Sequence, residues 1–281
     1  MNKLNAARRV AVVAALVAGN SIRATARMTS VSKPTILKLL VQLGNVCTQF
    51  HDQAVRNLRT KRVECDEIWQ FVGAKQKNVP EAKRETFGFG DVWTWTALDA
   101  DSKLIVSWLV GSRDGGAAYT LMQDVASRLR NRVQLTTDGH RSYLNAVEDA
   151  FGADVDYATL QKIYGSAQEN ETRYSPAKIV SSTTEIIKGN PNPKYISTSY
   201  VERQNLTMRM HIRRFTRLTN AFSKKLENHT AAVALHFVWY NFVRVHQTLR
   251  VTPAMEAGLT SRVWSIADIV ALLDAAEKKA A

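Results

Sequence analysis

The chain has 281 residues, of which 45% are hydrophobic and 22% are charged, a composition that supports a folded core and excludes wholesale disorder. It holds no run of about 18 uninterrupted apolar residues, so neither a membrane-spanning helix nor a membrane partner is predicted. The net charge of +13 is uneven: residues 1–65 hold eleven Lys or Arg against two acidic residues, and residues 203–225 hold seven against none. Two separated basic stretches indicate a polyanionic partner, most often a nucleic acid.

Cysteine usage bears on the compartment. Cys47 and Cys65 lie far apart, and neither belongs to a Cys-X-X-Cys pattern or to a Cys/His cluster. The sequence therefore supports neither a disulfide framework nor a zinc ribbon, and a reducing cytoplasm fits it.

The first segment predicts three helices. One covers residues 4–20, and the next two begin at Ser21 and Ser32, both of which are favourable N-caps. A helix, a short turn and a second helix of this length predict an all-α helix-turn-helix domain over residues 1–45. A small helical bundle with no binding role is the alternative. In a helix-turn-helix, the start of the last helix enters a major groove and would present Lys33, Thr35 and Lys38.

The segment that follows predicts an α+β fold with a mixed sheet. Three consecutive antiparallel strands are followed by a helix, a strand, a second helix and a further strand. Residues 161–198 are rich in Ser, Thr, Asn and Pro and are interpreted as an insertion with a small hairpin around 178–189. Two helices, over 197–215 and 227–246, come next. The predicted units are a helix-turn-helix domain (1–45), a linker with helical character (46–61), an α+β domain with the insertion (62–260) and a helical tail (261–281).

The apolar strand Arg62–Val72 contains three carboxylates, Glu64, Asp66 and Glu67. A buried and unpaired carboxylate is costly, so each must be neutralised or matched by a cation. Alternate side chains share one face of a strand, which places Glu64 and Asp66 on one face and Glu67 on the other.

Two further carboxylates complete a candidate site. Asp138 closes a predicted strand, Glu202 lies near the start of a helix, and a folded sheet can bring both to Asp66. Carboxylates without basic partners bind hard divalent cations, and two such ions can promote phosphodiester cleavage. Each residue has a plainer interpretation: Asp66 as a surface group, Asp138 as a turn residue before Gly139, and Glu202 as a capping box with Ser199.

Glu202 also begins a cationic ridge. On one continuous helix, Asn205, Arg209 and Arg213 would share its face, and Arg214 would flank them. Such a ridge would hold a metal ion at one end and a phosphate backbone along the rest. A solvated basic helix face is the alternative.

The segments CDEIW, TTDGHRSY, STSYVERQNLTMRMHIRRFTRLTNAFSKK and YNFVRVHQTLRVTPAMEAG strongly resemble bacterial insertion-sequence DDE transposases that have a short N-terminal helix-turn-helix. The resemblance covers nearly the whole chain. It implies a ribonuclease-H-like catalytic core with one Asp on the first strand, a second after the fourth strand and a Glu on a later helix. Asp66, Asp138 and Glu202 match these places. It also implies that Arg209, seven residues after the Glu, contacts transposon-end DNA.

The implied activity is DNA transposition in the cytoplasm, at the nucleoid. The helix-turn-helix would bind the terminal repeats of the element, and the three carboxylates would hold two Mg²⁺ (or Mn²⁺) ions per active site. Water would cleave the phosphodiester at an element end, and the freed 3′-OH would join target DNA. The implied partners are double-stranded DNA, both element ends and target, and further copies of the chain in a homo-oligomer on that DNA.

Several alternatives stay open. Glu67 competes with Asp66, and Glu185 or Glu171 competes with Glu202, because the spacing from Asp138 to Glu202 is longer than is common in the class. Many relatives carry an N-terminal zinc ribbon, for which this chain lacks the cysteines. A ribonuclease-H-like nuclease that cuts without joining, or a non-catalytic helix-turn-helix regulator, are the rival functions.

Overall fold

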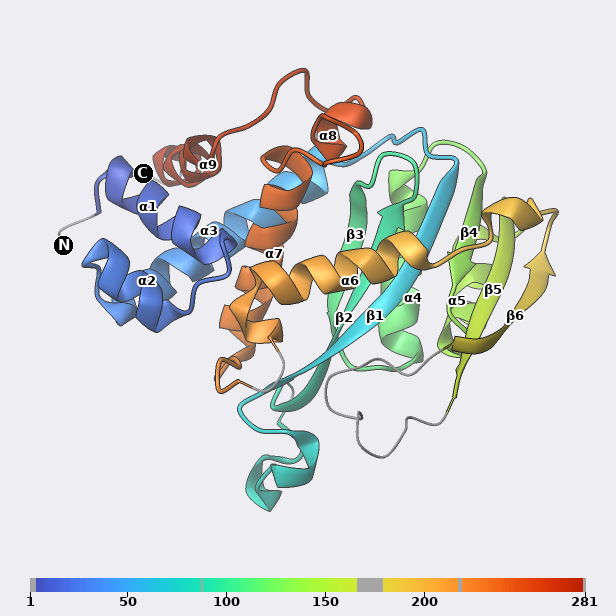
Figure 1. Cartoon of the computed structure of the whole chain (residues 1–281), viewed down its shortest axis with the longest axis horizontal. Helices are drawn as coiled ribbons and strands as arrows, with labels where there is room; N and C mark the ends of the chain where they lie inside the picture. Colours follow the sequence, from blue (N-terminus) through green and yellow to red (C-terminus); the bar gives the residue numbers. More distant parts are fainter. Residues whose placement is uncertain (1–3, 87, 166–178, 217–218, 280–281) are drawn as a thin grey trace.

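A six-stranded mixed sheet lies at the centre of the structure, a computed structural model that describes residues 4–86, 88–165, 179–216 and 219–279 (Figure 1). The strand order is β3-β2-β1-β4-β5-β6. Neighbouring strands are antiparallel except β1 with β4 and β4 with β5, which are parallel. The predicted mixed sheet is confirmed, and its order is consistent with a ribonuclease-H-like core. The strands are β1 (Arg62–Val72), β2 (Gly90–Asp99), β3 (Ile105–Gly111), β4 (Val133–Thr137), β5 (Val155–Tyr164) and β6 (Ile179–Lys188).

Helices cover both faces of this sheet. In Figure 1, α6 crosses in front of β1, whereas α4 and α5 lie behind the sheet. One buried cluster joins Val201 and Met208 of α6 to Ile68 of β1 and Phe237 of α7. The helices around the sheet are α4 (Gly115–Arg128), α5 (Ser142–Phe151), α6 (Ser199–His211) and α7 (Leu226–Phe242). Short helical turns are η1 (Gln76–Asn78), η2 (Glu81–Lys83), η3 (Pro193–Tyr195), η4 (Arg213–Phe215) and α8 (Pro253–Glu256).

Three helices form the N-terminal region: α1 (Ala6–Val17), α2 (Ile22–Thr29) and α3 (Lys33–Ala54). Ser21 and Ser32 are the N-caps of α2 and α3, because their hydroxyls accept the N–H groups of Ala24 (3.1 Å) and Thr35 (3.4 Å). The turn between these helices passes through Ser30, whose φ of 52° is in the left-handed region.

Helix α3 crosses residue 45, where the first domain was predicted to end, and runs on to Ala54 within the predicted linker with helical character. The physical reason is its apolar stripe, in which Leu39, Leu43 and Cys47 are all buried and face the rest of the protein. Helix α7 comes so close that a Cβ on Gly44 would lie 2.4 Å from the Cα of Ala231.

The C-terminal tail folds back onto the N-terminal helices. Helix α9 (Ile266–Lys279) packs on α1 and α3, and Arg9 Nη1 lies 2.7 Å from Asp274 Oδ1. Both ends of the chain therefore lie on the same side of the molecule (Figure 1). One continuous apolar cluster contains side chains from α1, α3 and α9 as well as from the sheet, so the predicted units share a core.

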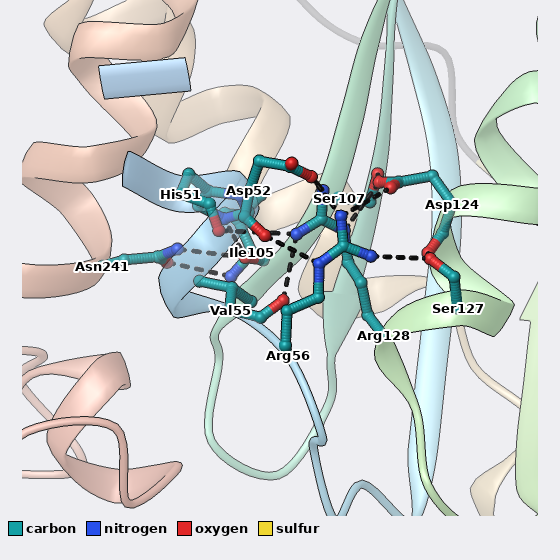
Figure 2. Close-up of polar contacts among 10 residues, drawn as sticks. All are labelled: His51, Asp52, Val55, Arg56, Ile105, Ser107, Asp124, Ser127, Arg128 and Asn241. Atoms are coloured by element: carbon teal, nitrogen blue, oxygen red, sulfur yellow. Dashed lines mark hydrogen bonds and ion pairs between the residues drawn. The ribbon is translucent and has the colours of Figure 1, made fainter. Parts of the chain in front are cut away.

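A polar network fastens the end of α3 to the sheet (Figure 2). Arg128 of α4 donates to the carbonyl oxygen of Val55 (3.0 Å) and to Asp124 Oδ2 (2.6 Å). The amide of Asn241 accepts from the N–H of Ile105 (2.9 Å) and donates to its carbonyl (3.0 Å). His51 Nε2 lies 3.0 Å from the same carbonyl. Because β3 is an edge strand, these side chains supply the hydrogen bonds that a further strand would have made.

The region 161–198 is more regular than predicted. Strand β5 extends to Tyr164, and residues 179–188 form the single strand β6, which pairs with β5. The predicted hairpin around 178–189 is therefore wrong, because the polar Ser/Thr stretch in β6 pairs with the preceding strand β5 and does not fold on itself. Residues 166–178, including Glu171, lie outside the described residues. Within the described residues, no helix is long and apolar enough to cross a membrane.

Candidate active site

The three predicted carboxylates line one open cavity of about 850 Å³. Asp66 lies in the middle of β1, and Asp138 follows β4 directly. Because β1 and β4 are parallel neighbours in which Cys65 faces Thr137, these two side chains start from adjacent positions. Glu202, in the first turn of α6, reaches the same cavity from above the sheet. Tertiary structure thus brings together the three residues that the sequence singled out.

Asp66 is held by neutral groups. Its Oδ2 accepts from the Asn205 side chain (2.7 Å), and its Oδ1 accepts from the N–H of Glu67 (2.8 Å). Burial, followed by the nearby charges of Asp138 and Glu67, raises the pKa of Asp66 to about 8. Ionised Asp66 is therefore stabilised when a positive charge enters the cavity.

Glu67 points to the opposite side of β1, toward α5. Its Oε1 accepts from Arg113 Nε (2.7 Å), and its Oε2 accepts from the Tyr143 hydroxyl (3.2 Å). Burial and the charge of Asp138 raise the pKa of Glu67, whereas its hydrogen bond to Arg113 lowers it. Arg113 Nη2 also lies 3.8 Å from Asp138 Oδ2, so this guanidinium bridges the two carboxylates.

The tightest carboxylate group differs from the predicted triple. One oxygen each of Asp66, Glu67 and Asp138 lies within 4.8 Å of the others, and among the described residues this is the group that could hold a metal ion. The sequence left the role of Glu67 open, and the structure places its carboxylate beside those of Asp66 and Asp138. Glu185, the described rival of Glu202, is exposed on β6 and does not line this cavity.

Glu202 makes contacts that exclude the capping-box interpretation. Its carboxylate forms an ion pair with Lys162 of β5 and accepts from the Thr198 hydroxyl (2.7 Å). The N–H of Ser199, which a capping box would direct to Glu202, donates instead to Ser197 Oγ (3.1 Å). The side chain of Glu202 is 40% exposed, and Lys162 lines the cavity with it.

Glu64 has a role that sequence reasoning missed. Its buried Oε2 accepts from the N–H groups of Tyr200 (2.8 Å) and Val201 (3.0 Å), at the N-terminus of α6. Burial raises the pKa of Glu64 to about 7, against the lowering effect of these two bonds. A carboxylate on the α6-facing side of β1 is suited to the positive end of a helix. Glu64 thereby fixes the turn of α6 that carries Glu202.

The predicted ridge along α6 is wrong beyond Arg209. The helix ends at His211, and Ile212 and Phe215 turn inward to bury their side chains in the cluster under α6 and α7. Arg213 therefore does not continue the face of Glu202. Arg209 stays on the helix and lines the carboxylate cavity.

The other predicted DNA-binding residues fall into two groups. Lys33, Thr35 and Lys38 are exposed at the start of α3, as predicted. Arg214 is half-buried: its Nη1 donates to the buried Ser223 hydroxyl (2.8 Å), and burial lowers its pKa to about 10. Arg213 and Arg214 line a second cavity of about 790 Å³ together with Lys33. Its described lining holds five Arg or Lys and no Asp or Glu. No local pattern in the sequence indicated that Lys33 lies beside the segment after α6.

Comparison with known proteins gives no close relative. No family model and no curated protein matches the chain. Among solved structures it is similar to the piggyBac transposase in a synaptic complex with hairpin DNA, with 12% identity and a TM-score of 0.42 over 97% of this chain and 71% of that chain. It is also similar to the Mos1 transposase paired-end complex with the left transposon end, with 12% identity and a TM-score of 0.25 over 56% of this chain and 59% of that chain. TM-scores below 0.5 do not establish a common fold, so the interpretation of the cavity rests on its own geometry.

Proposed function

We propose that the chain is a DDE-type DNA transposase that cleaves the ends of its insertion element and joins the 3′-OH to target DNA. One observation carries the proposal: carboxylates from β1, from the end of β4 and from α6 reach a single open cavity. Asp66, Asp138 and Glu202 are the proposed catalytic residues. The sequence motifs around them resemble those of the bacterial insertion-sequence family, which supports the same reading.

The cavity fits a divalent metal ion. Its carboxylates offer the hard oxygen donors that Mg²⁺ and Mn²⁺ prefer, and the pKa of Asp66 is raised first by burial and then by the charges of Asp138 and Glu67, so a bound cation would stabilise the ionised form. Asp66, Asp138 and Glu202 would hold two ions, with Glu67 beside them. When bound, such ions activate a water or hydroxyl and stabilise the leaving oxygen in phosphodiester cleavage.

The remaining side chains position these ligands and the substrate. Asn205 orients Asp66, and Lys162 and Arg113 balance Glu202 and Glu67. Both cations border the cavity, where they are placed to bind a phosphodiester when the carboxylates turn to a metal ion. Arg209, on the same wall, would contact the DNA backbone beside the scissile bond.

DNA is the proposed partner of the basic surfaces. Lys33, Thr35 and Lys38 would contact the terminal repeats as the start of a helix-turn-helix recognition helix. Arg213 and Arg214 would add backbone contacts in the basic cavity that also includes Lys33. Two ends must be cut together, so a homo-oligomer on DNA is part of the proposal.

The test uses the full-length chain with its element ends and Mg²⁺, and measures nicking, strand joining and end binding separately. Asp66→Asn, Asp138→Asn and Glu202→Gln are each expected to abolish nicking and to leave end binding intact. The loss should exceed the roughly 10- to 100-fold effect of groups that only support metal ligands. Asp154→Asn, an exposed carboxylate outside the cavity, is the matched control and should nick normally.

The outcomes separate the alternatives. If Glu202→Gln nicks at the wild-type rate and Glu67→Gln does not, the third carboxylate is Glu67. Nicking without any joining identifies a nuclease. End binding without nicking by the wild type, under every divalent metal tried, identifies a regulator that binds DNA only.

A further inference from the structure

The two edges of the sheet are finished differently. At the β3 edge, Asn241 and His51 bond the backbone of Ile105, so that edge is covered. At the other edge, β6 pairs only with β5 among the described residues. All but the last of its ten residues are exposed. Its pairing with β5 is continuous from Ser181 to Ile186 and is interrupted by β-bulges at Val180 and Ile187. A long and exposed edge strand is a template for pairing with another strand.

The sequence of β6 is symmetric in polarity about Thr183. Two apolar residues begin the strand and two more lie near its end, and hydroxyl side chains fill the middle. The apolar side chains face solvent, with exposures of 54% for Ile179, 69% for Val180, 54% for Ile186 and 38% for Ile187. Isolated exposed apolar residues are ordinary, but four on one edge strand form a surface that no other described strand or helix covers.

We propose that β6 pairs antiparallel with β6 of a second copy of this chain, about a twofold axis at Thr183. In this register Ile179 faces Ile187 of the other copy, and Val180 faces its Ile186. Each of these pairs occurs twice, and apolar cross-strand pairs stabilise a sheet. Thr183 faces its own counterpart in the middle of the joined strands.

Charge and register both favour a second copy over an unrelated strand. Glu185 is the one charged residue between 179 and 187, and it would face Ser181 of the other copy, not a like charge. Lys188 is already paired with Glu148. A slip by one residue in either direction would keep only one of the two kinds of apolar pair, and a slip by two would keep none, so the pattern favours this register.

The pairing would place the two carboxylate cavities close together. Lys162 and Gln161 of β5 line the cavity, and they pair directly with Ser182 and Thr183 of β6. The two β5 strands would be three strand spacings apart, or about 14 Å. Resting on the proposed function, this arrangement would let two active sites work on neighbouring phosphodiesters of one DNA. One pair of strands is a small interface, so association should be weak in free protein and stronger when two copies share DNA.

Cysteine cross-linking of the DNA-free, full-length chain tests the register. In the proposed dimer, the Thr183→Cys side chains face each other across the axis at the separation of an antiparallel pair, within reach of a disulfide. Ser181→Cys is the matched control, exposed on the same strand but four positions out of register with its own copy. The native Cys47 and Cys65 are buried and do not compete. Rapid disulfide-linked dimer for Thr183→Cys but not for Ser181→Cys is the expected result, and equal linking or none overturns the proposal.

Sedimentation equilibrium gives a second measurement that does not depend on folding of a cysteine variant. The wild type should show a concentration-dependent dimer. Ile186→Lys should raise the dissociation constant of this dimer by about tenfold or more, because it breaks two apolar pairs. Val263→Lys, a change at an exposed apolar residue away from β6, should leave it unchanged. A strictly monomeric wild type, or open-ended aggregates in place of a dimer, would overturn the pairing. Neither readout involves DNA cleavage, so failure here leaves the proposed transposase activity standing.

Discussion

Replacing Arg128 with alanine removes the side chain that ties the end of α3 to the sheet domain (Figure 2). The Arg128 side chain is only 6% exposed and is surrounded by acceptors. It donates to Asp124 Oδ2 at 2.6 Å, to the Val55 carbonyl at 3.0 Å and to Asp52 Oδ1 at 3.0 Å. The change therefore breaks these three hydrogen bonds and a longer one to the His51 carbonyl (3.4 Å), all from one charged group.

The magnitude follows from which partners can recover. Asp52 and Asp124 have side chains that are 56% and 32% exposed, so water can replace much of what they lose. Val55 is fully buried, and its carbonyl loses this donor without access to water. Hydrogen bonds to a charged group contribute about 1.5–3 kcal/mol each, and breaking a buried ion pair on one side costs about 3–5 kcal/mol. With the exposed acids discounted, Arg128→Ala should reduce the free energy of unfolding by about 3 kcal/mol.

Urea denaturation of the full-length chain measures this loss, with Arg262→Ala as the matched control. Arg262 pairs with Asp268 at the surface, its side chain is 59% exposed, and its removal should cost far less stability than Arg128→Ala because solvent screens the pair. Arg128→Lys should be intermediate, since it keeps the charge and loses the branched donor group. Equal losses for Arg128→Ala and Arg262→Ala would refute the reasoning, because burial would then have no bearing on the strength of this network.

Two further predictions concern pH and salt. Three buried histidines have pKa values lowered by burial to about 3, namely His51, His229 and His236. Their contribution to stability is complete above the unfolded-state pKa of about 6.5 and falls as pH drops toward 3, because only the unfolded state takes up these protons. The urea denaturation midpoint should therefore fall between pH 7 and pH 4, and it should fall less steeply for His236→Phe. Parallel pH profiles for the wild type and this variant would contradict the assignment. The double change Lys33→Ala and Arg213→Ala should weaken binding to duplex DNA and lower the magnitude of the slope of log affinity against log salt by about 1.8. The control Lys278→Ala should change neither the affinity nor the slope. If titrations at several salt concentrations give an unaltered slope for the double variant, Lys33 and Arg213 do not contact the DNA.

Local sequence chemistry determined most of the elements and the identity of the central carboxylates. Ser21 and Ser32 could be identified as helix starts from the sequence, because each serine hydroxyl accepts a hydrogen bond from the N–H only three residues later. The sequence likewise places Glu64 and Glu67 on opposite faces of β1, because side chains alternate between the two faces of any strand. Asp66 on the first strand and Asp138 at the end of the fourth needed no knowledge of distant contacts beyond the order of strands.

Tertiary structure decided where elements end and which partner each charged group takes. Helix α6 stops at His211 because Ile212 and Phe215 find burial against α7, and no signal within α6 itself announces that surface. Glu202 pairs with Lys162, forty positions earlier in the chain, in place of Ser199, which is three positions earlier. Asn205 holds Asp66 across a separation of 139 residues. Period and capping act over a few residues, whereas these pairings depend on which surfaces meet when the sheet and its helices pack, and the free energy that selects them comes from burial shared by the whole core.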